Sequence, residues 1–111
     1  MNSRDPIACV KVAACICAED GIISKAELQK MFEILSERFS KFSFESFEKA
    51  IDDFFDSGSQ IEEFLDAIDN QELRHFALRL SELSAAADGL DTRENVALEK
   101  AHLVWGIARH A

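Results

Sequence analysis

The chain has 111 residues, of which 48% are hydrophobic and 30% are charged, with one proline and four glycines. This length and composition are typical of one globular domain that buries a single hydrophobic core, so we predict one domain spanning residues 1–111. The formal net charge of −9 repels phosphate backbones and anionic lipid, which disfavours a nucleic-acid partner.

The first predicted helix starts at Asp5, an acidic N-cap followed by proline, and continues to about Glu19. Residues 12–15 resemble the cleavage box of a bacterial lipoprotein signal peptide. However, the preceding leader is acidic rather than basic, and Lys11 interrupts the apolar run. No stretch approaches the roughly 20 apolar residues of a transmembrane helix. We therefore expect neither export nor direct membrane insertion.

Three cysteines lie in this first helix, at positions 9, 15 and 17, without the Cys-x-x-Cys spacing of a metal or redox motif. The side chains of Cys15 and Cys17 point to different faces of a helix. We interpret all three as buried thiols in a reducing cytoplasm.

Five further helices are predicted, because start signals precede apolar residues at helical spacing. The predicted start signals are Ser24, Ser43, Ser59, Asp69 and Thr92. No stretch has the period-two alternation of a half-buried strand. The predicted fold class is therefore all-α, a single-domain bundle of about six helices joined by short turns.

Phenylalanine supplies most of the aromatic surface, since the chain has nine phenylalanines and no tyrosine. Phenylalanine has no polar group and favours burial. The phenylalanines expected in the core are Phe32, Phe44, Phe47, Phe54, Phe55, Phe64 and Phe76. The last helix is expected to bury Val96, Leu103, Val104 and Ile107. Trp105 is interpreted as a core residue, and the alternative is a part-exposed anchor for a partner.

Acidic residues surround apolar positions in segments 52–56 and 62–66. We interpret them as solvated helix faces. The alternative is an acidic surface that docks a basic partner.

A short pattern occurs twice, as CAEDGIISKAE at residues 17–27 and AAADGLDTREN at residues 85–95. Aligned on Asp-Gly, the two segments pair Ser24 with Thr92 and Glu27 with Asn95, and leave Glu94 one position early. A helix, an Asp-Gly turn and a second helix therefore form a hairpin that repeats at both ends of the sequence.

Each Asp-Gly turn has two interpretations. The glycine can end one helix, the hydroxyl can cap the next and the aspartate can bond backbone N–H groups, so both turns can be purely structural. Alternatively, a capping box bends Glu27 towards the loop of Asp20, and such clustered oxygens suit Ca²⁺ or Mg²⁺. No EF-hand spacing is present, so an ion would be shared between the turns or completed by water.

Segments 18–27 and 86–94 resemble the repeated Ala-Asp-Gly signature of the TerB-like family, the tellurite-resistance proteins. The resemblance implies a helical bundle whose internal pseudo-symmetry brings the two acidic turns near each other. It also implies a bacterial, cytoplasmic stress-response protein that binds a divalent cation, Ca²⁺ or Mg²⁺, and acts in a larger assembly at the inner face of the membrane. The metal-ligand candidates are Asp20, Glu27 and Asp88, together with the displaced Glu94.

The sequence contains no serine, histidine and acid at triad spacing, no glycine-rich phosphate loop and no metalloprotease helix. His75, His102 and His110 are interpreted as surface or partly packed residues. We therefore expect no enzymatic activity, and a hydrolase using these carboxylates around an ion lacks a nameable nucleophile. Two hypotheses remain: a cation-binding TerB-like domain acting through a protein partner, and a cation-independent helical interaction module with structural turns.

Overall fold

The computed structural model describes residues 4–109 and, within them, every side chain except that of Asp20. Its α-helices are α1 (Arg4–Cys17), α2 (Lys25–Arg38), α3 (Phe44–Ser57), α4 (Ile61–Asp66), α5 (Gln71–Ala85) and α6 (Thr92–Trp105). Two short 3-10 turns, η1 (Ala18–Asp20) and η2 (Ala86–Asp88), follow α1 and α5. No strand occurs among the described residues, which confirms the predicted all-α bundle. None of the helices in residues 4–109 is long and apolar enough to span a membrane.

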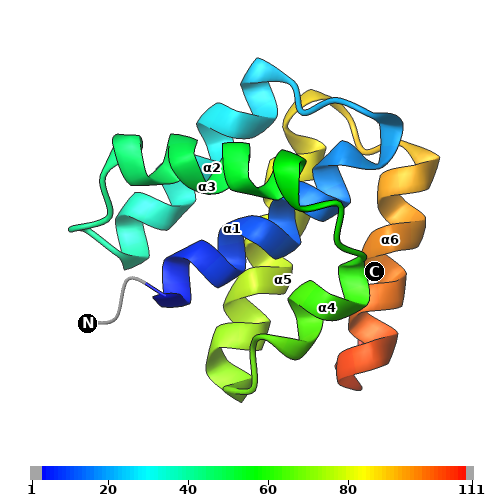
Figure 1. The fold of residues 1–111 in the computed structure, drawn as a ribbon. Helices are drawn as coiled ribbons and strands as arrows, with labels where there is room; N and C mark the ends of the chain where they lie inside the picture. Colours follow the sequence, from blue (N-terminus) through cyan, green and yellow to red (C-terminus); the bar gives the residue numbers. More distant parts are fainter. Residues whose placement is uncertain (1–3, 110–111) are drawn as a thin grey trace.

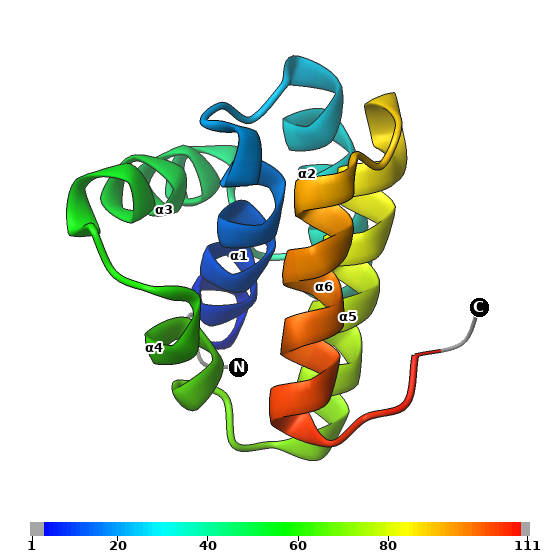
Figure 2. The same ribbon diagram turned by 90° about the vertical axis from the view of Figure 1, so that its right-hand side faces the viewer.

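Two hairpins, α1–η1–α2 and α5–η2–α6, form the repeat, and their first helices pack against each other through the centre of the molecule (Figures 1 and 2). Helix α2 packs against α5 and contacts η2, whereas α6 contacts α1 and η1. Helices α3 and α4 cover α1. Most of α1 is buried, as expected for a helix that is apolar on nearly all sides. The two hairpins therefore share one core, and their turns lie at the same end of the molecule.

Helix α1 begins at Arg4, one residue before the predicted N-cap Asp5. Pro6 occupies the first turn, where N–H groups have no partner within the helix, so proline removes no hydrogen bond there. The α-helix ends at Cys17, before the predicted end at about Glu19, because the next three residues form the tighter 3-10 turn η1. Gly21 then ends the segment with φ of 99°, a left-handed conformation that favours glycine.

The N-caps of the five later helices were predicted to within one residue. The observed N-caps are Ser24, Ser43, Gln60, Asn70 and Asp91. The first two confirm the predictions, and the other three lie one residue from the predicted Ser59, Asp69 and Thr92. Asn70 caps α5, because its side chain accepts the Leu73 N–H at 3.0 Å. Leu73 itself is buried.

The predicted phenylalanine core is confirmed except at two positions of α3. Phe47 and Phe64 are buried, and Phe32, Phe54 and Phe76 are partly buried and pack against the core. Phe44 and Phe55 are 54% and 51% exposed, so their predicted burial is wrong. Both lie at the edge of the buried stripe of α3, one on each end of the helix.

Helix α6 buries a different face from the predicted one. Val96, Leu103 and Val104 are exposed, Leu103 at 82%, while Ile107 packs against the core as predicted. The buried residues of α6 are Glu94, Ala97, Leu98, Ala101 and Trp105. The prediction selected the larger apolar side chains, whereas the buried face combines Leu98 and Trp105 with two alanines, Ala97 and Ala101. The prediction for Trp105 is confirmed, and its indole N–H donates to the Leu65 carbonyl at 3.2 Å.

Candidate functional site

Two capping boxes begin α2 and α6 and hold a glutamate in each. In the first, Ser24 Oγ accepts the Glu27 N–H at 3.1 Å, and Glu27 Oε1 accepts the Ser24 N–H at 2.8 Å. In the second, Asp91 Oδ1 accepts the Glu94 N–H at 2.9 Å, and Glu94 Oε1 accepts the Asp91 N–H at 3.2 Å. Each box bends its glutamate side chain back over the start of its helix.

These boxes correct the predicted register of the repeat. Glu94, not Asn95, is the structural equivalent of Glu27, and Asp91 is the equivalent of Ser24. The second turn has one residue fewer between its glycine and its N-cap. Gly89 adopts a ψ of 119° where Gly21 has −14°, which reflects the shorter connection. The second hairpin therefore keeps the carboxylate that the alignment on Asp-Gly had removed.

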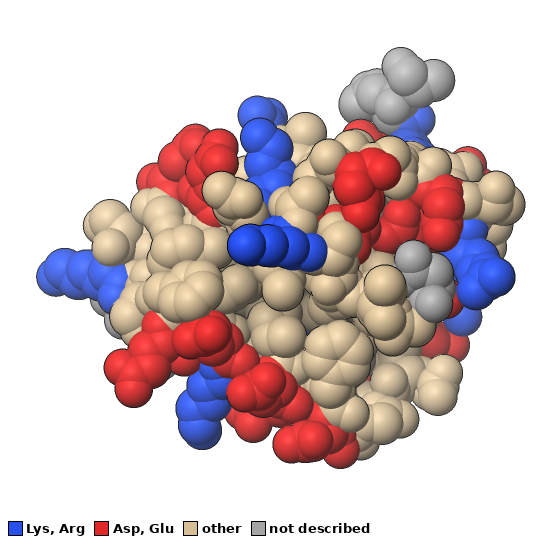
Figure 3. Space-filling model, turned by 90° about the horizontal axis from the view of Figure 1, so that it is seen from above, with Lys and Arg blue, Asp and Glu red and all other residues tan. Residues whose placement is uncertain are grey.

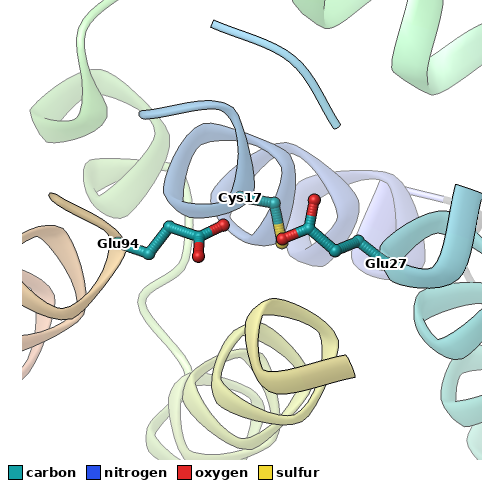
Figure 4. A group of neighbouring side chains, drawn as sticks. All are labelled: Cys17, Glu27 and Glu94. Atoms are coloured by element: carbon teal, nitrogen blue, oxygen red, sulfur yellow. The ribbon is translucent and has the colours of Figure 1, made fainter. Parts of the chain in front are cut away.

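The two glutamates meet at the end of α1. Glu27 and Glu94 extend towards one another from α2 and α6, with Cys17 of α1 between them (Figure 4). One ligand atom from each of the three residues lies within 4.8 Å of the others. Glu27 is 3% exposed, Glu94 is 2% exposed and Cys17 is fully buried. The site is thus a buried junction between the two hairpins.

The structure brings together two of the four predicted metal-ligand candidates, Glu27 and Glu94. Asp88 lies in η2, where it is exposed, and its carboxylate does not belong to the convergent group. Asp20 ends η1, and its side chain lies outside the described part of the chain. Sequence reasoning missed Cys17, which was interpreted as a core thiol. The available signal was its position, as the last α-helical residue before the first repeated turn.

The environment of Glu94 favours its protonated form. Burial raises the pKa of Glu94 to about 8, and hydrogen bonding to the Glu27 carboxyl adds to this rise, while the Asp91 N–H opposes it. When both carboxyl groups are ionised, no donor faces the buried Oε2 of Glu94. Two facing carboxylates offer each other lone pairs alone, so a proton between them satisfies both. The raised pKa therefore favours a protonated Glu94 at neutral pH.

A cation can neutralise the same pair in place of the proton. Ligand atoms around a tetrahedral Zn²⁺ ion, with bonds of about 2.0 to 2.3 Å, lie roughly 3.3 to 3.8 Å apart. Atoms within 4.8 Å of one another would therefore have to close by up to about 1.5 Å to bind it. The orphaned Oε2 of Glu94 is a ready donor. The residues present therefore fit a small divalent ion.

The remaining candidate residues have structural roles or lie at the surface. His75 is exposed, and His102 is partly buried with Nδ1 at 3.0 Å from the Ile107 carbonyl. His110 lies outside the described residues. All three cysteines are buried and none forms a disulfide. Burial, the largest cause in both cases, raises the pKa of Cys9 to about 12 and that of Cys15 to about 11, as expected for inert core thiols.

Comparison of the chain with protein-family models, with curated proteins and with solved structures found no match. Inferences about function therefore depend on the geometry of the Glu27–Glu94 junction and on the repeated turns in the sequence.

Proposed function

We propose that this protein is a TerB-like cytoplasmic stress-response domain of the tellurite-resistance type, which binds one divalent cation at the Glu27–Glu94 junction and acts through a protein partner. The carrying observation is the buried pair of opposed carboxylates with the Cys17 side chain in reach. Two ionised carboxylates at such a site lose hydration and repel each other, so they need a counter-charge. A cation supplies that charge and joins the two hairpins.

The ligand atoms favour Zn²⁺ over the Ca²⁺ or Mg²⁺ that the family resemblance implies. Ca²⁺ takes six to eight oxygen ligands, and Mg²⁺ takes six, usually with several waters. Here Oε1 of each carboxylate already accepts a backbone N–H, and the third possible ligand is the Cys17 sulfur. Carboxylate oxygen and thiolate sulfur are both established Zn²⁺ ligands, and Zn²⁺ needs four donors in total.

The cellular setting of the proposal comes from the TerB-like resemblance. The two Asp-Gly turns of this protein lie at one end of the molecule, and the resemblance implies such an arrangement through an internal pseudo-symmetry (Figures 1 and 2). The bacterial cytoplasm and the assembly at the inner face of the membrane are carried over from the family. The proposed role is binding rather than catalysis, because Cys17, Glu27 and Glu94 are all buried, which leaves a substrate no access to them.

A second candidate function is a cation-independent helical interaction module in which both turns are structural. The raised pKa of Glu94 favours it, because a shared proton neutralises the carboxylate pair without an ion. Both capping boxes are also complete without one.

Metal titration separates the two functions. Chelator-treated protein is titrated with Zn²⁺, Ca²⁺, Mg²⁺ and Mn²⁺ by calorimetry, and its thermal midpoint is measured with each ion. We expect one Zn²⁺ per chain, proton release on binding, and a midpoint that rises by several degrees when the ion is in large excess over its Kd. Glu94→Gln removes this response, whereas the matched control Asp88→Asn retains it. No heat and no shift with any of the four ions would leave the structural module as the function.

A further inference from the structure

We infer that the groove between α2 and α3 docks a basic amphipathic helix of a partner protein. This inference deepens the proposed function, since it gives the partner a chemistry, but the groove itself does not depend on a bound cation. The Glu27 side chain points into the junction with Glu94, whereas Leu28, the next residue of α2, lines the groove. The two sites therefore lie on different faces of α2.

The groove is an apolar hollow with an acidic rim. It encloses about 200 Å³ and is lined by Leu28, Phe44, Phe47, Glu48, Ile51 and Asp52. Four of these residues are apolar, and both of the charged ones are acids. A hollow of this composition accepts an apolar side chain and attracts a positive charge beside it.

Exposed aromatic rings are held in place at both ends of α3. The Phe44 ring packs edge-on against Phe32, with centroids 5.1 Å apart, and lies 5.9 Å from that of Phe47. At the other end, the Phe55 ring packs against Phe54 with centroids 5.1 Å apart. Both outer rings are about half exposed. Rings that are already fixed lose little entropy when a partner covers them, which suits them to binding.

The spacing of these residues sets the length of the occupant. Positions 44, 48, 51 and 55 follow the pattern i, i+4, i+7, i+11 and lie on one stripe of α3. At 1.5 Å per residue, the stripe spans roughly 16 Å, or about three helical turns. A partner helix of similar length, with apolar residues at the same spacing, can pack along it as helices in grooves do.

Charge selects a basic occupant. Glu45, Asp52 and Asp56 each directly follow an apolar position of the stripe, and all three are exposed. Figure 3 shows the acidic side chains as a row along α3, beside an uncharged surface. Such a row repels anionic lipid and nucleic acid, and it attracts lysine or arginine on the flanks of a helical peptide. These observations favour a basic protein helix over a membrane surface.

The test uses three synthetic peptides of about four helical turns and the full chain. The first carries leucines at i, i+4, i+7 and i+11 with lysines on both flanks, the second has the same composition in scrambled order, and the third replaces each lysine by glutamate. Binding of the labelled peptides is measured by fluorescence anisotropy. We expect saturable binding of the first peptide, weakened about tenfold or more by Phe55→Ser and by Asp52→Lys. We expect no binding of the glutamate peptide.

Matched variants keep the result interpretable. Glu63→Lys makes the same charge change on α4, away from the groove, and should alter the affinity less than about twofold if the interaction is local. Circular dichroism confirms that each variant is folded. Equal binding of the scrambled peptide, an equal loss with Glu63→Lys, or no loss with Phe55→Ser would each overturn the inference. Self-association that Phe55→Ser abolishes would also overturn it, because the occupant would then be a second copy.

The same measurement distinguishes this inference from the proposed function. Chelator-treated protein should bind the lysine peptide as tightly as untreated protein. Peptide binding without any response to metal would leave the groove intact and reject the cation site. A metal response without peptide binding would support the cation site and reject the groove as a docking site.

Discussion

Two interactions of the Glu94 side chain favour different protonation states. Its Oε1 accepts the Asp91 N–H that closes the second capping box, which favours the carboxylate. Its burial and its contact with the Glu27 carboxyl favour the protonated acid. A shared proton or a bound cation is compatible with both interactions. The unfolding free energy should therefore depend on whether the proton or the cation is present.

Unfolding free energy should therefore fall with rising pH. The pKa of Glu94 is about 8 in the folded protein against 4.5 for an unperturbed glutamate, so the folded state keeps a proton that the unfolded state releases between these values. The stabilisation is fully present below pH 4.5 and is lost as the pH rises through about 8. Urea unfolding of chelator-treated protein across this window measures the slope.

Glu94→Gln is the control for this pH dependence. The amide can accept the Asp91 N–H and donate to Glu27, so it mimics the protonated acid and should remove most of the slope. A wild-type profile that is flat between pH 4.5 and 8, or an equal slope in the variant, would contradict the assigned pKa.

At the scale of the helix, sequence reasoning succeeded where local chemistry decides. The Ser24 and Ser43 caps, the glycine that ends η1 and the absence of strands among residues 4–109 all follow from residues adjacent in the chain. It failed for the buried face of α6, because it selected the larger apolar side chains and passed over Ala97 and Ala101. Adjacent residues of a helix point about 100° apart, so Val96 and Val104 lie off the face that buries Ala97 and Trp105.

The observed burial predicts opposite outcomes for two leucines of α6. Leu98 is fully buried, so Leu98→Ala should lower the unfolding free energy by about 2 to 5 kcal/mol through lost burial and a cavity. Leu103 is exposed, so Leu103→Ala should change it by less than about 0.5 kcal/mol. Denaturant titrations measure both values. Similar losses for the two variants would contradict the observed buried face of α6.

The candidate site needed the whole molecule. The capping box predicted that Glu27 bends back over its helix, but no local pattern shows that Glu94 lies opposite it. That contact arises because α2 lies against η2 and α6 lies against η1. Cys17 joins the pair because α1 ends between them (Figure 4). Convergence of three helix ends is a property of tertiary packing, which spacing along the chain does not encode.

The same packing predicts that the two hairpins unfold together. Helix α2 packs on α5 of the other hairpin, and α6 contacts both α1 and η1, so neither hairpin buries its apolar face alone. Trp105 reports on the second hairpin, since its indole N–H bonds to Leu65 and its ring lies 5.4 Å from the Arg74 guanidinium. Its fluorescence and the far-ultraviolet circular dichroism of all helices should therefore give one coincident urea transition. A dichroism change that precedes or follows the fluorescence change would show that one hairpin folds independently, and the Glu27–Glu94 junction would then open without loss of both halves.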